Sequence, residues 1–266
     1  MRVGFIGLGS QGAPMARRIV EAGFETTLWA RRAEALAPFT DTAARVAGSP
    51  AEVAAASDLV CLCVVDDQGV EEVAEGVLAG FHKGGIIAVH STVHPDTCRR
   101  LAERASGQGV LVLDAPVSGG GRGAAEGTLL VMVGGPEEAV SVCRPVFSSY
   151  GDPVVHLGDV GTGQVAKLLN NLLFTAQLGL AADTLALGGE LGLDPVELGR
   201  MLTRGSSASF ALGRLVDAGG TLERISGHAG ALLAKDVRLL GEIAGERGAG
   251  GAVRGAAGAA LGAMGV

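Results

Sequence analysis

The stretch that decides the fold lies at the start of the chain and reads Val3-Gly4-Phe5-Ile6-Gly7-Leu8-Gly9-Ser10-Gln11-Gly12. Its apolar half predicts a short buried strand, and residues Ala13 to Ala22 predict a helix. A strand, a G-x-G-x-x-G turn and a helix form the fingerprint of a dinucleotide-binding unit. Gly7 makes the turn, Gly9 lets the backbone approach a pyrophosphate, and Gly12 lets the helix pack on the strand. We therefore expect a Rossmann-type domain whose first cofactor-binding residues are Gly7, Leu8, Gly9, Ser10, Gln11 and Gly12.

The second predicted strand, Thr26 to Ala30, indicates which nicotinamide cofactor is bound. An NAD site usually has an acidic residue about 20 residues past the glycines, where it accepts from the ribose 2′-hydroxyl. Here the chain reads Trp29-Ala30-Arg31-Arg32 instead. The acid is absent, and two guanidinium groups follow that suit a 2′-phosphate. A solvated basic turn is the alternative interpretation. The pattern favours NADP over NAD, with Ala30, Arg31 and Arg32 as cofactor-binding residues.

Strands and helices continue to alternate through the first half of the chain. Further strands are predicted at residues 59–65, 85–90, 110–113, 129–133 and 154–157. The carboxyl ends of parallel strands face the ligand crevice of such a sheet, so four more cofactor contacts are predicted, namely Val64, Val65, Ser91 and Thr92. His90 and His94 have no catalytic partner visible in the sequence and are interpreted as structural.

A glycine-rich segment follows the strand at residues 110–113 and reads Asp114-Ala115-Pro116-Val117-Ser118-Gly119-Gly120-Gly121. Bare N–H groups beside the Ser118 hydroxyl are suited to binding an oxygen-rich ligand. A flexible glycine turn is the alternative. We expect Ser118, Gly119 and Gly120 to form an oxygen-binding loop.

A second decisive stretch reads Gly161-Thr162-Gly163-Gln164-Val165-Ala166-Lys167-Leu168-Leu169-Asn170-Asn171. Its glycines permit a tight turn, after which a helix is predicted as far as Leu193. Lys167 and Asn171 are four residues apart and therefore lie one above the other on that helix. A surface lysine with its stem on apolar neighbours is the alternative interpretation.

Beyond Gly163 the pattern becomes wholly helical, with further helices at residues 195–203, 208–218, 229–247 and 252–264. The predicted fold class is therefore α/β, with an N-terminal Rossmann-type dinucleotide-binding domain joined by a long interdomain helix to an all-α domain. The boundaries are residues 1–161 for the NADP-binding domain and 162–266 for the substrate and oligomerisation domain.

Composition excludes several classes of protein. The 266 residues carry a net charge of −7, which argues against nucleic acid as a partner. The spacing of Cys61 and Cys63 is not a metal or redox spacing, and no metal site is predicted. A signal peptide contains an apolar region of about 7–15 residues, and the glycine turn that begins at Gly7 comes too soon for one. No apolar run approaches the roughly 18 residues of a membrane helix. We expect a soluble cytoplasmic protein with reduced cysteines.

The four signatures together resemble those of the β-hydroxyacid dehydrogenase family, which includes 3-hydroxyisobutyrate dehydrogenase and tartronate semialdehyde reductase. They are the first glycine fingerprint, the Asp114–Gly120 segment, the Gly161–Asn171 segment and Lys235-Asp236. The resemblance covers nearly the whole chain. It implies that Lys167 is the catalytic acid/base, that Asn171 and the Ser118–Gly120 loop hold a substrate carboxylate, and that Thr92 and Lys235 lie near the cofactor.

Three features depart from that family pattern. Arg122 follows the glycine loop where a small residue is usual, and His228 stands where an aromatic residue is common. Both are candidates for substrate binding, and for Arg122 the alternative is a simply exposed side chain. The C-terminus, at Val266, is shorter than is usual in the family.

The resemblance predicts an NADP-dependent enzyme that acts on a small hydroxy acid or its semialdehyde. The alternatives are an imine reductase, a class that typically replaces the lysine, and a catalytically silent NADP-binding regulatory module. The apolar helical half predicts a homodimer or larger homo-oligomer.

Overall fold

The protein is described by a computed structural model, which covers residues 1–245 and 249–266. The chain divides into two compact units, residues 1–167 and 168–266. The division predicted from the sequence, between residues 161 and 162, lies six residues before the boundary of these units. A long helix therefore begins within the first unit and continues into the second.

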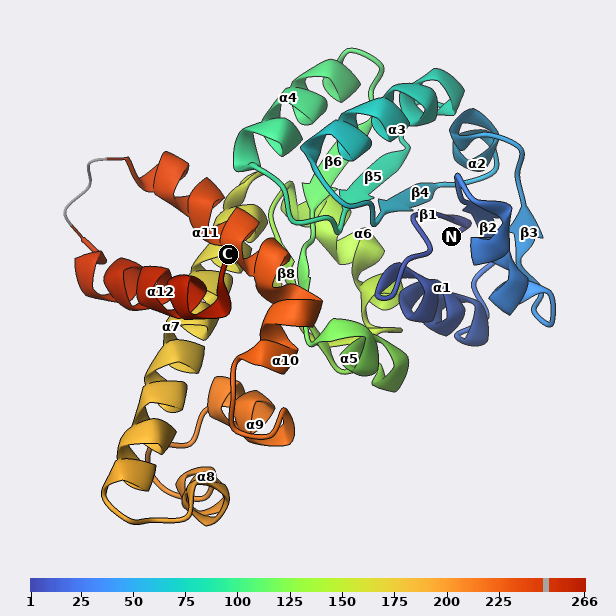
Figure 1. The fold of residues 1–266 in the computed structure, drawn as a ribbon. Helices are drawn as coiled ribbons and strands as arrows, with labels where there is room; N and C mark the ends of the chain where they lie inside the picture. Colours follow the sequence, from blue (N-terminus) through green and yellow to red (C-terminus); the bar gives the residue numbers. More distant parts are fainter. Residues whose placement is uncertain (246–248) are drawn as a thin grey trace. The chain divides into compact units, whose positions relative to one another are not determined.

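The first unit is built on a six-stranded parallel sheet with the order β3-β2-β1-β4-β5-β6. Its strands are β1 Val3–Ile6, β2 Thr26–Trp29, β3 Arg45–Val46, β4 Leu59–Leu62, β5 Ile86–Val89 and β6 Leu111–Asp114. The order reverses between β1 and β4, so the crevice beyond their carboxyl ends is the expected site of a ligand. Figure 1 shows these strands at the centre of the unit.

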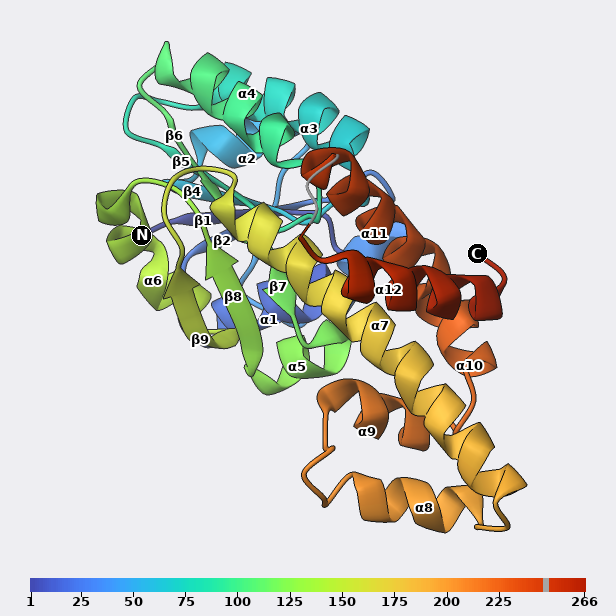
Figure 2. The same cartoon turned by 90° about the vertical axis from the view of Figure 1, so that its left-hand side faces the viewer.

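Helices cover both faces of this sheet because its buried side chains alternate between them. On one face, Phe5 and Cys61 pack with α1 (Gly12–Glu21) and α6 (Glu137–Phe147). On the other, Ile6 and Leu62 pack with three helices, α2 Pro50–Ala55, α3 Asp67–Gly80 and α4 Pro95–Ser106. Figures 1 and 2 show α3 and α4 side by side over that second face.

A smaller mixed sheet completes the first unit. It has the order β7-β8-β9, with β7 Val117–Ser118, β8 Leu129–Val133 and β9 Gly151–His156. β7 is antiparallel to β8, and β9 is parallel to β8. The helix α5, Gly120–Glu126, follows β7. The predicted glycine loop is therefore largely structured, since Ser118 ends a strand and Gly120 begins a helix.

The second unit is wholly helical in the part of the chain that the structure describes. Its helices are α7 Thr162–Glu190 from residue 168 onward, α8 Pro195–Leu202, α9 Phe210–Asp217, α10 Glu223–Ile225, α11 Ala231–Ala244 and α12 Gly251–Met264. A π-helical turn, Ser226–Gly230, precedes α11. The helix predicted at residues 229–247 corresponds to this turn and α11, and its last two residues lie outside the described residues.

The core of the second unit forms around α7. Leu168 and Leu172 pack with Leu239 of α11 and Ala257 of α12, and further along α7, Leu178 and Leu185 pack with residues of α9, α11 and α12. Both figures show α11 and α12 beside α7.

One described helix, α7, is long and apolar enough to cross a membrane by length and composition alone. The sequence prediction concerned uninterrupted apolar runs, and α7 is not one, because polar residues are spaced along it. Core helices of soluble proteins meet the same two criteria. α7 supplies central leucines of the core of the second unit, and 33% of its apolar window is buried.

Candidate active site

The glycine turn after β1 has the shape that a pyrophosphate requires. Gly7 has φ +100, and a Cβ there would overlap the carbonyl oxygen of Cys63. A Cβ on Gly12 would overlap the carbonyl oxygen of Gly7, so α1 packs directly on the turn. Nothing lies within 4 Å of the Cβ position at Gly9, which leaves open space above the backbone. The first turn of α1 has no acidic residue and no side-chain cap. A dinucleotide phosphate fits this site.

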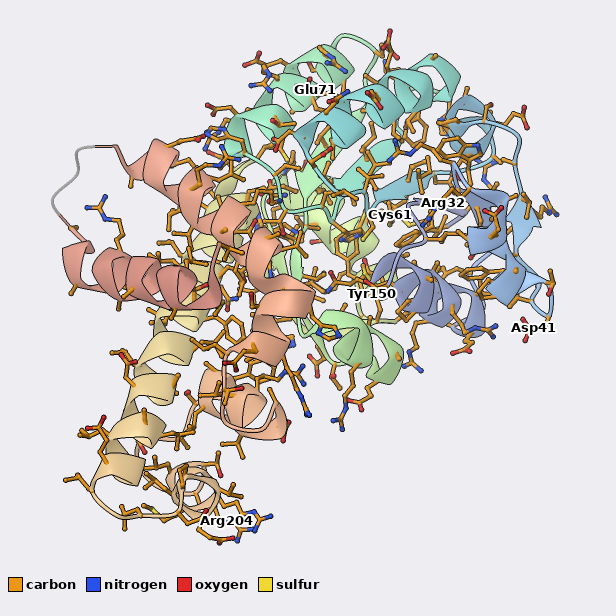
Figure 3. The ribbon with its side chains drawn as sticks, in the orientation of Figure 1. Arg32, Asp41, Cys61, Glu71, Tyr150 and Arg204 are labelled. Atoms are coloured by element: carbon orange, nitrogen blue, oxygen red, sulfur yellow. The ribbon has the colours of Figure 1, made fainter. Side chains whose placement is uncertain are left out.

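The end of β2 presents two cationic side chains to solvent. Arg31 and Arg32 directly follow the strand and are exposed, and Figure 3 labels Arg32. Within residues 1–245 and 249–266, neither forms an ion pair with an acidic side chain. Glu34, the nearest acidic residue, lies in the following 3₁₀-helix, Ala33–Phe39, and is exposed. Both guanidinium groups are therefore available to an anionic ligand.

The glycine-rich segment around Ser118 lies against the first glycine turn. A Cβ on Gly121, in the first turn of α5, would lie 2.7 Å from the carbonyl oxygen of Ser10. Gly119, between β7 and α5, has φ +133, a conformation that other residues rarely adopt. The structure thus brings together two segments that are more than 100 residues apart in the sequence.

Hydrogen bonds link the residues that follow β4, β5 and β6. The Val64 N–H donates to Ser91 Oγ at 2.8 Å, and Gln164 Nε2 donates to the Ser91 carbonyl oxygen at 2.8 Å. The Val93 N–H donates to Gln164 Oε1 at 3.1 Å. Ser91 and Gln164 are both buried. The strand ends predicted to contact the cofactor are therefore joined to the beginning of α7.

Asp114, at the end of β6, bonds to the same first turn. Its Oδ1 accepts from the Gly161 N–H at 2.6 Å, and its Oδ2 accepts from the Gln164 N–H at 2.8 Å. Burial raises the pKa of Asp114 above its usual value, and the hydrogen bonds from these two N–H groups oppose that rise. The carboxylate therefore caps the helix on which Lys167 lies half-buried.

In the second unit, Asn171 belongs to a buried polar cluster with two residues of α11. Asn171 Nδ2 donates to Asp236 Oδ2 at 2.5 Å, and Lys235 Nζ lies 3.3 Å from Asp236 Oδ1. Asn170 Nδ2 donates to Asn171 Oδ1 at 3.0 Å. These contacts fix the orientation of the Asn171 amide. The structure thus brings together two of the predicted site residues, Asn171 and Lys235.

The remaining candidates lie on exposed surfaces of their own units. The Arg122 side chain is 83% exposed and pairs with Glu126, one turn further along α5, at 2.7 Å. His228 lies in the π-helical turn, with Nδ1 2.9 Å from the Arg224 carbonyl oxygen. Val65 is also exposed, just beyond β4.

His90 is buried among aromatic rings, in the structural role predicted for it. Nδ1 lies 2.6 Å from the carbonyl oxygen of Ala115, and Nε2 lies 3.1 Å from the Tyr150 hydroxyl. Because a carbonyl only accepts, Nδ1 carries the hydrogen and Nε2 accepts from Tyr150. Burial lowers the pKa of His90 to about 4. His94 caps α4, where its ring accepts from the Asp96 N–H.

Cys61, Cys63 and Cys143 lie in or against the same core, whereas Cys98 lies in the core on the other face of the sheet. All four cysteines are free, and burial raises the pKa of Cys63 and Cys143 to about 12. Figure 3 labels Cys61 and Tyr150 in this region.

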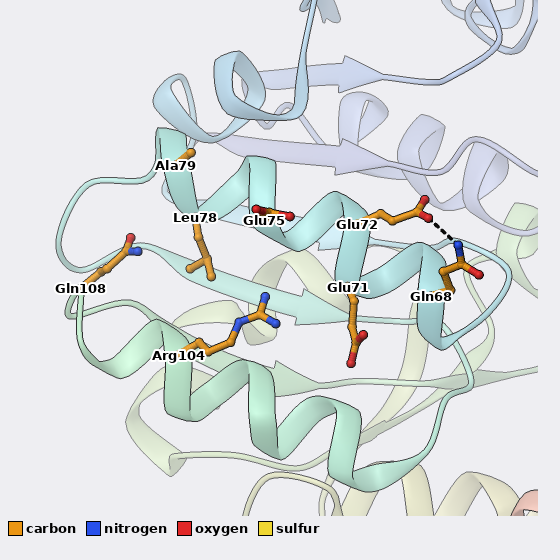
Figure 4. A pocket seen from close by; sticks show the side chains of 8 residues that line it. All are labelled: Gln68, Glu71, Glu72, Glu75, Leu78, Ala79, Arg104 and Gln108. Carbon is orange, nitrogen blue, oxygen red and sulfur yellow. Dashed lines mark hydrogen bonds between the residues drawn. The ribbon is translucent and has the colours of Figure 1, made fainter.

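A surface hollow of about 650 Å³ lies between α3 and α4. Its rim carries Glu71, Glu72 and Glu75, and Figure 4 shows Arg104 reaching from α4 toward α3. Three carboxylates at the rim do not suit a dinucleotide, whose phosphates are anionic. The glycine turn after β1 remains the candidate cofactor site.

Sequence reasoning missed the roles of Asp114, Gln164 and Asp236. All three were in the quoted signatures, but no ligand or structural role was predicted for them. For Gln164 one signal was available: it lies three residues before Lys167, on the same side of the helix. A buried acid at the end of a strand was the corresponding signal for Asp114.

Two family descriptions match most of the chain. Residues 2–158 match the NAD binding domain of 6-phosphogluconate dehydrogenase. Residues 161–263 match the family described as NAD-binding of NADP-dependent 3-hydroxyisobutyrate dehydrogenase.

Individual dehydrogenases are also similar to this chain in sequence and in structure. The 3-hydroxyisobutyrate dehydrogenase of Pseudomonas aeruginosa is 36% identical over 213 residues, which is 79% of this chain and 72% of the relative. The NAD-dependent L-serine dehydrogenase of that organism is 34% identical over 253 residues, which is 91% of this chain and 85% of the relative. Among solved structures, Mycobacterium tuberculosis 3-hydroxyisobutyrate dehydrogenase with L-serine has a TM-score of 0.85 and 29% identity, covering 97% of this chain and 91% of its own. The chain therefore belongs to the β-hydroxyacid dehydrogenase family and is an NAD(P)-dependent oxidoreductase of the 3-hydroxyisobutyrate dehydrogenase type.

Proposed function

We propose that this enzyme prefers NADP and interconverts a small β-hydroxy acid and its semialdehyde, with Lys167 as the general acid/base. The observation that carries this proposal is the retention of Lys167, Asn171 and Ser118 in one chain with an intact cofactor turn. Two relatives are named for 3-hydroxyisobutyrate and L-serine. Both molecules carry a hydroxyl group on the carbon beta to a carboxylate, which defines the proposed substrate class.

When bound, the nicotinamide supplies or accepts the hydride. A residue of the protein must then donate a proton to the substrate oxygen, or accept one from it. In the reducing direction, the Lys167 ammonium donates a proton to the oxygen that becomes the hydroxyl and stabilises the negative charge that develops there. In the oxidising direction, the neutral amine accepts that proton.

Other residues hold the reacting groups. We propose that the Asn171 amide and the N–H groups near Ser118, Gly119 and Gly120 bind the substrate carboxylate, which orients the reacting carbon. Arg122 and His228 remain candidates for selecting among acids. The Gly7–Gly12 turn, Val64, Val65, Ser91, Thr92 and Lys235 are proposed to hold the cofactor.

We further propose a soluble, cytoplasmic homo-oligomer. The alternatives, an imine reductase or a silent NADP-binding module, are disfavoured by the retained lysine. A reaction panel of β-hydroxy acids, aldehyde acids and cyclic imines, run with both cofactors, separates the three.

The central test is Lys167→Met, which keeps an unbranched side chain only one atom shorter and removes the proton donor. We expect turnover to fall about a thousandfold or more, since both proton transfer and charge stabilisation are lost. Cofactor affinity, measured by fluorescence titration, is expected to stay close to that of the wild type. Lys83→Met, on the exposed surface of the same unit, is the matched control and should be fully active. Retention of a tenth of the activity by Lys167→Met would contradict the proposed role.

A further inference from the structure

A buried network of five hydrogen bonds connects three strand ends to the first turn of α7. We define the network by Val64, Ser91, Val93, Asp114 and Gln164, with Gly161 as a further donor. Gln164 is its central member, because its side chain bonds to the segment after β5 and its backbone N–H bonds to the end of β6.

Both polar atoms of the Gln164 side chain are hydrogen-bonded, one as an acceptor and the other as a donor. Oε1 accepts from the Val93 N–H, and Nε2 donates to the Ser91 carbonyl oxygen. Gln164 is 0% exposed, so water cannot replace either bond. A buried polar group that loses its partner is costly, which makes this arrangement rigid.

The first turn of α7 is also fixed by packing. Gly161 has φ +97, and a Cβ there would lie 2.9 Å from the Arg99 guanidinium. A Cβ on Gly163 would lie 2.9 Å from Asp114 Oδ2 and 3.0 Å from the Asp114 carbonyl oxygen. The turn therefore has little freedom to shift relative to β6, and Lys167 follows Gln164 by three residues on the same side of the helix.

We propose that Gln164 is a positioning residue that holds the turn preceding Lys167 at a fixed place relative to the Ser91–Val93 segment. The inference rests on the proposed function, in which Lys167 exchanges the proton and Ser91 and Thr92 contact the cofactor. The proton donor and the nicotinamide must approach the same substrate carbon and oxygen, so their separation has to be constant. Asp114 assists by fixing the backbone of the same turn.

The first test is Gln164→Met, which has a similar volume and forms neither hydrogen bond. A misplacement of 1 Å in an active site costs up to about a hundredfold in rate. We expect kcat to fall roughly tenfold to a hundredfold, with KM for the hydroxy acid changed much less. In the cofactor-free protein, amide hydrogen exchange at Val93 should become faster, because its acceptor is lost.

The matched control is Ser57→Ala. Ser57 is also buried in the first unit, and its hydroxyl donates to the Val53 carbonyl oxygen at 2.6 Å within the α2 region. This variant removes a buried hydrogen bond remote from the network. It should lower the melting temperature without changing kcat, which separates positioning from general stability.

The second test is Gln164→Glu, whose result depends on pH. The protonated carboxyl group can donate to the Ser91 carbonyl oxygen and accept from the Val93 N–H, as the amide does. The ionised form cannot donate and places negative charge against that carbonyl. Titratable and charged groups near this position are Asp114 from β6, Cys98 and Arg99 from α4, and Asp67 from α3. Lys167 follows Gln164 by three residues on α7. Activity relative to the wild type should therefore fall as pH rises.

The outcomes distinguish this inference from the proposed function. Wild-type kcat and wild-type exchange at Val93 in Gln164→Met would overturn the positioning role, even if Lys167→Met is inactive. An active Lys167→Met would overturn the proposed function, whereas exchange at Val93 would still report on the network. If Gln164→Met does not fold, a Gln164→Glu variant whose relative activity is independent of pH overturns the inference.

Discussion

At the scale of single residues, the choice of cofactor depends on the three positions after β2. Ala30 is neutral and leaves space, whereas an aspartate there would repel a 2′-phosphate that carries nearly two negative charges. Arg31 and Arg32 are exposed at this point. Each charge-assisted hydrogen bond to the phosphate is worth about 1.5–3 kcal/mol. One such bond gives roughly a tenfold or greater preference for NADP, at about 1.4 kcal/mol per decade.

We predict that Arg31→Ala removes most of that preference and that Ala30→Asp combined with Arg31→Ala reverses it. Fluorescence titrations with both cofactors measure the change. Added salt should weaken NADP binding more than NAD binding, since the contacts are solvent-exposed. Arg45→Ala, on the neighbouring strand β3, is a suitable control because Arg45 pairs with Glu25. Equal or tighter binding of NAD by the wild type contradicts the assignment.

His90 makes the stability of the protein depend on pH. The unfolded chain binds a proton on histidine near pH 6.5, whereas burial lowers the pKa of His90 in the folded protein to about 4. Lowering the pH through this window therefore favours the unfolded state, which holds the proton more tightly. The stabilisation is complete above about pH 6.5 and is lost as the pH falls toward 4. The shift corresponds to about 3 kcal/mol of unfolding free energy.

We predict that His90→Gln reduces the loss of unfolding free energy between pH 7 and pH 4.5. Urea titrations at several pH values give this quantity. Tyr150→Phe serves as the control, because it removes the hydrogen bond to Nε2 but leaves a buried histidine. If His90→Gln and the wild type lose stability in parallel, His90 does not cause the dependence.

At the scale of elements, the sequence predicts well those strands and turns that are determined by residues within one short segment. The strands β1, β4 and β5 of the parallel sheet are short, continuous apolar runs, and the turn after β1 is specified by Gly7, Gly9 and Gly12 within six residues. The predicted ends differ from those observed by a few residues. β4, for example, ends at Leu62 rather than Val65.

Three of the missed elements, β3, β7 and α5, have weak local signals. The helix α2 was also missed, although Ser49 caps it and Pro50 begins it. β3 and β7 are two residues long, which is too short for any periodicity. α5 begins at Gly120 and contains three glycines, which are poor helix formers. It forms because it packs on α1, and that contact is not visible in a local stretch of sequence.

In the candidate site, too, the residues that could be predicted are specified within one segment, and the contacts that were missed join distant segments. Lys167, Asn171 and the glycine turn were predicted from their own segments. The bonds from Gln164 to Ser91 and from Asn171 to Asp236 span 73 and 65 residues. Such pairs arise only when the chain folds, so spacing alone could not reveal them.

At the scale of the whole molecule, α7 carries an apolar surface that its own unit does not cover. Leu169, Leu173, Leu180 and Leu187 are each between 51% and 59% exposed. The last three are spaced seven residues apart and therefore lie along one side of the helix. The sequence predicted an interface from two apolar segments, residues 172–187 and 252–261. Leu172 and Leu261, at the ends of these segments, are instead buried in the core of the second unit.

We predict that this leucine stripe, Leu169, Leu173, Leu180 and Leu187, forms the interface of a homodimer. A contiguous apolar stripe of this length is unusual on a monomer, and a second copy supplies a matching stripe by two-fold symmetry. Light scattering at micromolar concentration should give a mass of about twice 26.6 kDa or a larger multiple. Leu173→Glu combined with Leu180→Glu should yield monomers, because the burial of two carboxylates opposes association. Val142→Glu, at a similarly exposed apolar position on α6, should leave the assembly unchanged. A wild-type monomer, or a double variant that remains assembled, would show that the stripe is not the interface.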